Sequence, residues 1–244
     1  MSLEELFEKF VNERIYLKNA TDSTVKFYRA SWKITKAHLN AKTPADLCKD
    51  ALNDLLISWR KARQSTKSIN TYISFFNSFL TWLHEEGHTS THFKLKKLKQ
   101  EQTVFKVFTE AHIRVILNYQ PRDYYDFRLW TTLCLLLDTG LRISEALNLK
   151  DEDIKFDQLV IVVKGKGRKE RYVPFSPEMR KILWRFIKKR NVLRVNGGNL
   201  FPTISGRTMS QRNFLRDMKA FCKKLGIEGV RVSPHTIRHS YAIW

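Results

Sequence analysis

A cluster of basic side chains near residue 240 has the types and spacing needed to handle an anion. The segment SPHTIRHSYA, residues 233–242, places His235, Arg238 and His239 on adjacent turns of an expected helix. A guanidinium is always charged and binds phosphate oxygens in a fixed fork geometry, and an imidazole exchanges protons near neutral pH. Two histidines four residues apart could instead hold zinc, but no glutamate stands between them and no further ligand is nearby. We therefore expect anion chemistry and no metal here.

A second arginine follows a glycine in the segment TGLRISEALNL, residues 139–149. Arg142 and Glu145 are three residues apart, which places them on one face of a short helix. Taken alone, this spacing is typical of a surface ion pair. The glycine before the arginine suggests a tight entry into the helix.

A basic turn lies in VKGKGRKERYVPF, residues 163–175. Two runs rich in β-branched and aromatic residues flank the letters GKGRK, which predicts a hairpin. A turn that contains glycines can bend towards a phosphate, although a solvated turn would have the same composition. The basic side chains of this segment are Lys164, Lys166, Arg168, Lys169 and Arg171.

The letters HEEGH at residues 84–88 match a zinc-protease pattern, H-E-x-x-H. That pattern needs one continuous helix to present both histidines, and Gly87 is a natural helix stop. We expect an exposed helix end here and no metal site.

Together and in this order, the three segments TGLRISEALNL, VKGKGRKERYVPF and SPHTIRHSYA resemble the tyrosine recombinase family, the lambda-integrase and Xer-like enzymes. The resemblance covers nearly the whole chain. It implies a mainly α fold with a small β-sheet or hairpin, in which a helical core-binding domain and a catalytic domain form a C-shaped clamp on DNA. It also implies catalytic roles for Arg142, Lys166, His235 and Arg238, supported by Glu145 and His239, without a metal or nucleotide cofactor.

The nucleophile of that family is a tyrosine on a later helix, after a second histidine or tryptophan. Tyr241 follows Arg238 by only three residues, and its neighbours Ala242, Ile243 and Trp244 resemble core residues. We therefore expect the nucleophile to be absent from this chain. Two alternatives follow: a site-specific recombinase or integrase that uses a 3′-phosphotyrosine, or a truncated, inactive DNA-binding protein that regulates recombination sites. A type IB topoisomerase shares the chemistry, but the Xer-like front domain argues against it.

The hydrophobic pattern predicts two domains. Residues 1–87 contain four helices, at about 3–18, 22–39, 50–63 and 65–86. Residues 88–105 lose the periodicity and gain Lys94, Lys96 and Lys97, which indicates an exposed basic linker. The family resemblance implies that residues 106–244 are the catalytic domain, which we expect to be C-terminally incomplete. Its expected helices begin after Thr109, cover 124–139 up to Gly140, and lie at about 176–193, 210–225 and 233–244.

Charge indicates the partner. The chain has 44 Lys and Arg against 24 Asp and Glu, and residues 164–224 carry 18 basic and 3 acidic side chains. Such a density favours double-stranded DNA, bound through its phosphates. The candidate DNA contacts are Lys164, Arg168, Lys169, Arg171, Lys94, Lys96 and Lys97. The family resemblance implies a tetramer on paired DNA sites, formed from a monomer or weak oligomer, on a phage or other mobile element.

Location and redox state follow from what the sequence contains. No signal peptide opens the chain, and the longest apolar run, residues 129–137, is too short to span a bilayer. Three widely spaced cysteines, Cys48, Cys134 and Cys222, are expected to be buried, reduced thiols. We therefore expect a cytoplasmic protein without a membrane partner.

Overall fold

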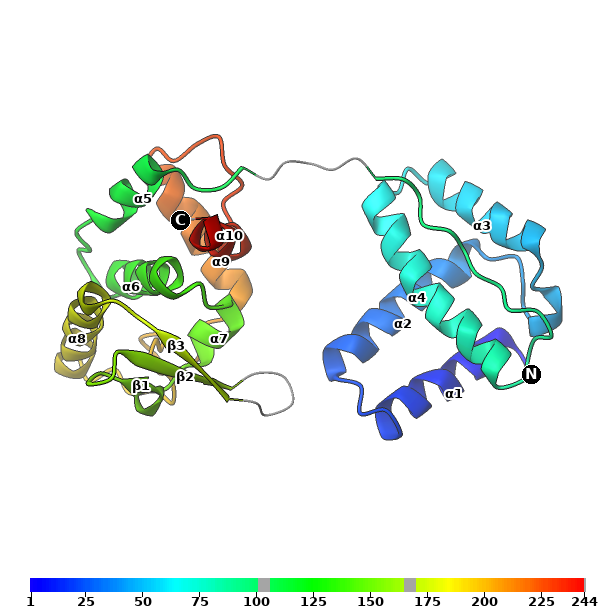
Figure 1. The fold of residues 1–244 in the computed structure, drawn as a ribbon, viewed down its shortest axis with the longest axis horizontal. Coiled ribbons are helices and arrows are strands. Elements are labelled where there is room, and N and C mark those ends of the chain that lie inside the picture. Colours follow the sequence, from blue (N-terminus) through cyan, green and yellow to red (C-terminus); the bar gives the residue numbers. More distant parts are fainter. Residues whose placement is uncertain (101–105, 165–169, 244) are drawn as a thin grey trace. The chain divides into compact units, whose positions relative to one another are not determined.

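The computed structural model describes residues 1–100, 106–164 and 170–243. The chain divides into two compact units, Met1–Thr103 and Val104–Trp244, and each is described here by itself (Figure 1). The predicted site residues Lys166, Arg168 and Lys169 lie outside the described residues.

The first unit consists of four helices, as the hydrophobic pattern predicted. They are α1 (Leu3–Tyr16), α2 (Asp22–His38), α3 (Lys49–Lys61) and α4 (Thr66–Glu85), with a short 3₁₀ turn, η1, at Pro44–Asp46. Ser2, Thr21 and Ser65 cap three of the helices through their side-chain oxygens. The buried stripes of the helices meet in a core rich in aromatic side chains, among them Phe7, Phe10, Trp32, Phe75, Phe76, Phe79 and Trp82.

Cys48 corrects the expectation of three buried thiols. Cys134 and Cys222 are buried, but Cys48 is exposed. It is the N-cap residue of α3, and its sulfur accepts a hydrogen bond from the backbone N–H of Ala51 at 3.4 Å. A thiol in a cap position must face the first turn of the helix, so the apolar sequence around it does not bury it.

The predicted linker, residues 88–105, begins before the packed part of the first unit ends. Residues 93–98 pack along α4, and Leu95 is buried in the core of the first unit. Two asparagines of α4 bind this segment. The side-chain amide of each donates to the carbonyl oxygen of one residue and accepts from the N–H of the same residue. Asn77 makes this pair with Leu95 at 2.9 and 2.8 Å, and Asn70 makes it with Leu98 at the same distances. Most of the segment predicted as an exposed linker therefore belongs to the first unit.

The second unit surrounds one central helix. Its helices are α5 (Glu110–Leu117), α6 (Tyr124–Thr139), α7 (Ile143–Asn148), α8 (Pro177–Val192), α9 (Gln211–Lys224) and α10 (Pro234–Ile243), with a 3₁₀ turn, η2, at Asp151–Asp153. Twelve of the sixteen residues of α6 are buried, so its apolar run lies in a protein core. Within the described residues, we find no helix that is long and apolar enough to cross a membrane.

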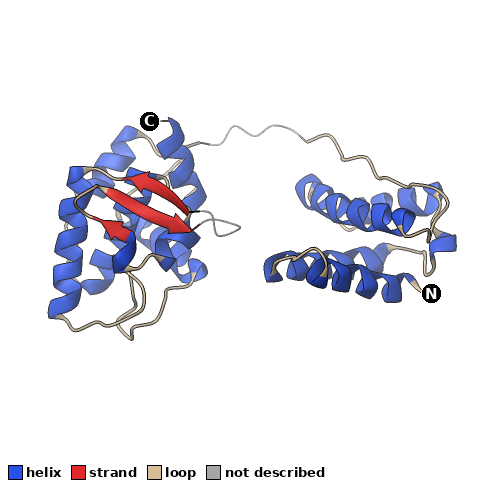
Figure 2. Ribbon diagram, turned by 60° about the horizontal axis from the view of Figure 1, so that its bottom comes forward, coloured by secondary structure: helices blue, strands red, loops and turns tan. Residues whose placement is uncertain are grey.

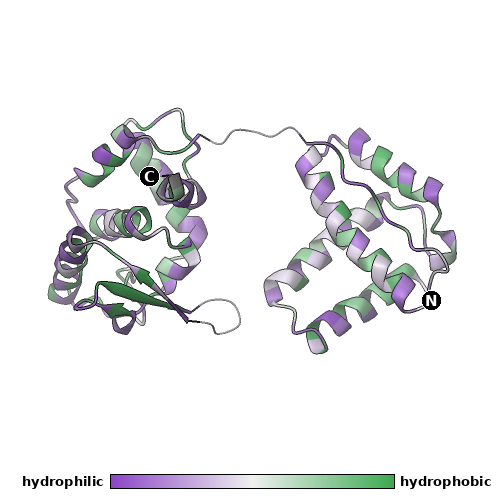
Figure 3. Ribbon diagram, in the orientation of Figure 1, coloured by the Kyte–Doolittle hydropathy of each residue, from purple (hydrophilic) through white to green (hydrophobic). Residues whose placement is uncertain are grey.

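A three-stranded antiparallel sheet completes the second unit (Figure 2). The order is β1 (Ile154–Lys155), β2 (Val160–Lys164) and β3 (Glu170–Pro174). The register pairs Val162 with Tyr172 and Lys164 with Glu170, so the predicted hairpin is confirmed. The alternating side chains Ile161 and Val163 enter the core, and Figure 3 shows β2 as mostly hydrophobic. The two-residue strand β1 was not predicted, because two residues carry no period.

Candidate active site

Arg142 stands at the N-terminus of α7, as its N-cap residue. Its backbone N–H donates to Glu145 Oε2 at 2.8 Å, and its Nη1 donates to Glu145 Oε1 at 2.9 Å. Sequence spacing had placed the two side chains on one helical face. The structure shows instead a capping arrangement, in which the glutamate reaches back over the first turn. This contact orients the backbone and the guanidinium of Arg142 together.

Arg171 binds the same carboxylate from the hairpin. Its Nη1 and Nη2 donate to the two oxygens of Glu145 at 2.9 and 2.8 Å, in a bidentate pair. Burial raises the pKa of Glu145, but the hydrogen bonds from Arg171 and Arg142 outweigh it and lower the pKa to about 2. Arg171 was predicted as a DNA contact; here its side chain is 38% exposed and its guanidinium is paired with Glu145. The alternation along β3, which sets Arg171 on the side of Val173 and leaves Tyr172 exposed, is the signal that could have found this.

Gly140 connects α6 to Arg142 and receives two side chains from α10. It ends α6 in the left-handed conformation, with φ of 60°. Arg238 donates from Nη1 to the carbonyl oxygen of Gly140. The ring of Tyr241 packs directly on the glycine, where an added Cβ would collide with it. Arg238 is therefore bonded to the residue that lies two positions before Arg142 in the chain. The two arginines themselves are 96 positions apart in the sequence.

Helix α10 presents its residues to two sides. Thr236, Ile237 and Ser240 are buried, and Ser240 Oγ accepts a hydrogen bond from the backbone N–H of Phe108 at 2.9 Å. His235 and His239 are exposed on the opposite side, with ring centroids 4.4 Å apart in an edge-on arrangement. The helix thus anchors its basic cluster through a small buried face.

Two of these arginines, Arg171 and Arg238, line a small cavity. A hollow of about 310 Å³ is lined by Arg171, Arg238 and Tyr241, among others. The structure therefore brings Arg142, Glu145, Arg171 and Arg238 to the junction of α6 and α7. It places His235 and His239 on the exposed side of α10.

Tyr241 differs from its expected surroundings. The residues after it were expected to be core, but Ala242 is exposed. The ring of Tyr241 is 46% exposed and lies against Gly140. The side chains of the last two residues are outside the description.

The remaining candidates separate into exposed lysines and a helix end. Lys94, Lys96, Lys97 and Lys164 are all exposed. The HEEGH segment lies where α4 ends at Glu85, and Gly87 has a φ of 72°, so the predicted helix end is confirmed. In the described part of the chain, no group of three or more His, Cys, Asp or Glu residues could hold a metal ion.

Comparison with known proteins agrees with this fold and gives the family of the chain. The model of the phage integrase family matches residues 106–244, and the chain belongs to that family. Tyrosine recombinase XerA of Pyrococcus horikoshii is 29% identical over 240 residues, which are 98% of this chain and 78% of that protein. Tyrosine recombinase XerD of Yersinia pestis is 28% identical over 249 residues, covering 97% of this chain and 82% of its own.

Solved structures share the fold. A lambda integrase dimer bound to a COC′ core site superposes with a TM-score of 0.79 at 17% identity, covering 99% of this chain and 86% of that one. The Tn1549 transposon integrase in complex with transposon right end DNA gives a TM-score of 0.81 at 19% identity, with 99% and 85% coverage. At these identities the likeness establishes the architecture, while the family match rests on the sequence.

Proposed function

We propose that this chain binds double-stranded DNA and carries the phosphate-activating residues of a tyrosine-type site-specific recombinase of the integrase kind. The observation that carries the proposal is the bond from Arg238 to the carbonyl oxygen of Gly140, which lies two residues before Arg142. Glu145 holds the first arginine, and the carbonyl oxygen of Gly140 holds the second. Membership of the phage integrase family and the tyrosine recombinases among its relatives support the same reaction class.

The two arginines suit the transition state of strand exchange. In that reaction a hydroxyl attacks a DNA phosphate, the bond to the 5′-oxygen breaks, and negative charge builds on the non-bridging oxygens. Two fixed guanidiniums stabilise that charge without reorganising during the reaction. Removing one such preorganised donor costs about 10²–10³ in rate.

The proposed proton transfers are assigned to His235 and Lys166. His235 is exposed near the start of α10 and would accept the proton of the attacking hydroxyl. Lys166 would protonate the departing 5′-oxygen, and this role depends on the family resemblance. No metal or nucleotide is needed, because the phosphotyrosine bond conserves the energy of the broken phosphodiester.

We propose further that no tyrosine of residues 1–244 is the nucleophile. Tyr241, the tyrosine nearest to Arg238 in sequence, has its ring packed on Gly140, which favours a structural role. The same packing favours a second candidate function, that of a DNA-binding protein that occupies recombination sites without cleaving them. A nicked substrate that traps covalent intermediates tests, on a denaturing gel, whether any tyrosine of residues 1–244 attacks the DNA. A protein–DNA adduct that disappears in Tyr241→Phe would contradict this assignment.

The phosphate site can be tested on the chain as it stands. Selection of bound DNA from a genomic library would first define the target sequence. Uncharged methylphosphonates would then replace single phosphates across that site. One position should weaken binding in the wild-type chain and have little effect in Arg142→Gln and Arg238→Gln. Arg180→Gln, an exposed arginine of α8, is the matched control. The proposal fails if no position responds in an arginine-dependent way.

The assembly proposed for this activity is a tetramer on two paired DNA sites, acting in the cytoplasm. Without DNA we expect a monomer or a weak oligomer. Sedimentation with and without a DNA duplex that carries the selected site measures both states. A stable tetramer of the free chain would contradict the second expectation.

A further inference from the structure

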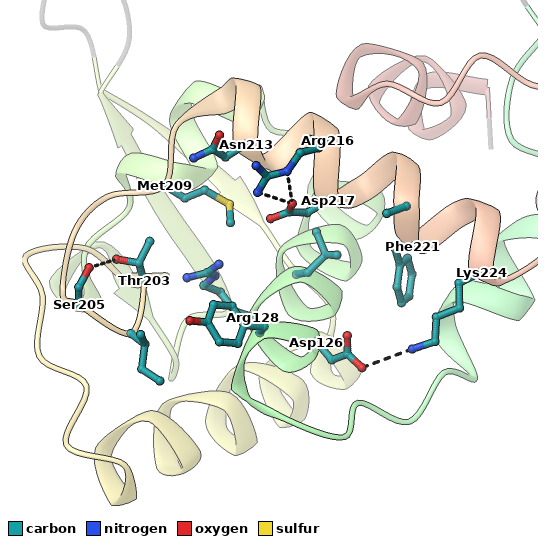
Figure 4. Close-up of a pocket in the computed structure, with 14 residues that line it drawn as sticks. Asp126, Arg128, Thr203, Ser205, Met209, Asn213, Arg216, Asp217, Phe221 and Lys224 are labelled. Atoms are coloured by element: carbon teal, nitrogen blue, oxygen red, sulfur yellow. Dashed lines mark hydrogen bonds and ion pairs between the residues drawn. The ribbon is translucent and has the colours of Figure 1, made fainter.

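A second cavity in the catalytic unit is unrelated to the arginine site. It has a volume of about 580 Å³ and lies between α6, α9 and residues 203–209 (Figure 4). This size is typical of small-molecule sites. None of the residues proposed for phosphate chemistry lines it.

Arg128 of α6 lines this cavity and lacks an acidic partner. The residue is 3% exposed, and its Nη1 donates to the carbonyl oxygen of Pro202 at 3.1 Å. Its Nε is buried and has no hydrogen-bond acceptor among the described residues. Burial lowers the pKa of Arg128, and the opposing effects of Tyr124 and Asp217 do not offset it. The rings of Tyr124 and Tyr125, 5.9 and 5.5 Å from its guanidinium carbon, offset part of the cost of burying this charge but supply no acceptor for Nε.

Arg190, the other buried arginine among the described residues of this unit, shows the contrast. Arg190 is 7% exposed, and its Nη1 donates to Asp151 Oδ1 at 2.8 Å and to the carbonyl oxygen of Leu200 at 3.1 Å. These contacts raise the pKa of Arg190, with the hydrogen bond to Asp151 as the largest cause. The fold thus supplies a carboxylate to one buried arginine and leaves the other facing a cavity.

The charged side chains that line the cavity include one more positive than negative charge. Asp217 accepts from Arg216 Nε at 2.9 Å. Asp126 accepts from the hydroxyl of Tyr119 and lies 3.7 Å from Lys224 Nζ. Both carboxylates therefore have partners on the wall, and Arg128 remains. A single uncompensated charge matches a monoanion better than a phosphate, which carries close to two negative charges near neutral pH.

The rest of the wall is suited to an apolar group. Leu129, Met209, Ala220 and Phe221 line the cavity beside the guanidinium. We propose that this cavity binds a small monocarboxylate, with its carboxylate paired to Arg128 and its hydrocarbon part against Met209 and Phe221. A planar guanidinium pairs with a carboxylate through two parallel hydrogen bonds, and the apolar wall contributes burial.

The test compares a carboxylate with its neutral counterpart. 4-Phenylbutyrate and 4-phenylbutanamide differ only in the charged end, and ligand-detected NMR in 150 mM salt gives both dissociation constants. We expect the amide to bind at least about tenfold more weakly, because a hydrogen bond to a charged group exceeds a neutral one. Equal binding of the two compounds would overturn the proposal.

Variants assign the binding to this cavity. Because Arg128 is buried, its replacement can unfold the unit, so the decisive variant is Ala220→Phe. Ala220 is exposed on α9 and lines the cavity, and a phenyl ring there fills the space while Arg128 stays in place. Binding of 4-phenylbutyrate should be lost. Gln211→Phe adds the same ring to an exposed position of α9 outside the cavity and should leave binding unchanged.

Two further outcomes bear on the proposal. Undiminished binding in Ala220→Phe would overturn the assignment of the site. Tighter binding of an acetylated and amidated Leu-Glu-Leu peptide than of 4-phenylbutyrate would overturn the small-molecule ligand in favour of a protein segment. DNA binding by the same variants reports on the proposed recombinase function separately, so the two proposals fail independently.

Discussion

Glu145 is the residue through which two segments of the second unit orient Arg142. Its carboxylate accepts from the backbone and side chain of Arg142 and from both terminal nitrogens of Arg171. With these donors the carboxylate of Glu145 stays ionised at pH values where a free carboxyl group is protonated, because they lower its pKa to about 2. The acid therefore acts on any bound phosphate through the arginine that it holds.

This predicts a pH-dependent contribution to stability. The pKa of Glu145 is about 2 in the folded unit and 4.5 for the unperturbed group, so the unfolded chain binds more protons between these values. The stabilisation is complete above about pH 5 and is lost as the pH falls towards 2. Glu145→Gln should lower the free energy of unfolding at pH 7 by about 1–2 kcal/mol, less than the full shift because both arginines are partly exposed.

Urea unfolding at pH 7 and pH 3 measures this difference. The gap between wild type and Glu145→Gln should shrink at the lower pH. Glu152→Gln removes an exposed carboxylate, 3.4 Å from Lys150 Nζ, and should change little at either pH. A gap for Glu145→Gln that is constant with pH would contradict the role assigned to the ionised carboxylate.

Gly140 is the other residue on which the site depends. It needs a positive φ, and the ring of Tyr241 occupies the space of a side chain. Gly140→Ala should destabilise the unit by about 1 kcal/mol for the backbone and a further 1–3 kcal/mol for the collision. Gly226 also has a positive φ but nothing within 4 Å of an added Cβ, so Gly226→Ala should show the backbone cost alone.

A double-mutant cycle separates the two costs of Gly140→Ala. In a Tyr241→Ala background, the collision is absent and the cost of Gly140→Ala should fall to that of Gly226→Ala. Thermal or urea unfolding of the four variants gives the coupling energy. Additive effects of Gly140→Ala and Tyr241→Ala would show that the ring does not occupy this position.

At the scale of elements, the segment after α4 is held by side chains. Asn70 and Asn77 lie seven residues apart on α4, so both face the same extended segment and pair with Leu98 and Leu95. Asn77→Ala should destabilise the first unit by about 1–3 kcal/mol, because it removes two hydrogen bonds at a partly buried position. Hydrogen exchange of the Leu95 amide should accelerate. Ser78→Ala, next to it and half-buried, removes only a bond to the carbonyl oxygen of Ser74 and should leave that amide protected.

The elements also show what the sequence could predict. Helices such as α4 and α6 were predicted because long apolar stripes and the stops at Gly87 and Gly140 are local signals. The β2–β3 hairpin was predicted from its period and its glycines. The packing of Leu95 on α4 was missed, because an extended segment covered on one side by asparagines has no helical or strand period.

The same limit applies to the candidate site. The sequence predicted Arg142, Glu145 and Arg238 as a set through the family motifs. Arg171 was assigned to DNA because its neighbours form a basic run. Its bond to Glu145 joins residues 26 positions apart, and such a contact depends on the register of β3 against α7. The cavity around Arg128 could not be predicted from the sequence either. The pattern of α6 is that of an ordinary core helix with one arginine among apolar residues.

At the scale of the whole molecule, charge sets the behaviour towards DNA. The formal net charge is +20, and the exposed lysines 94, 96 and 97 belong to the first unit while Lys164 belongs to the second. Both units therefore carry exposed positive charge. Phosphate contacts release condensed counterions, so the affinity of such a protein for DNA falls steeply with salt.

We therefore predict strong salt dependence of DNA binding by this chain. With 6–10 phosphate contacts, affinity should fall about 10³–10⁵-fold between 50 and 200 mM salt. If Lys94, Lys96 and Lys97 each contact a phosphate, their joint change to glutamine should reduce the slope of log affinity against log salt by about 2.7. Fluorescence anisotropy with a labelled duplex over that range measures the slope.

The control is a triple change of the exposed lysines 18, 49 and 61 to glutamine. They also lie in the first unit, and the change removes the same charge outside the proposed contact set. Equal slopes for the two triple variants would show that net charge alone, and no defined contact by residues 94–97, governs binding.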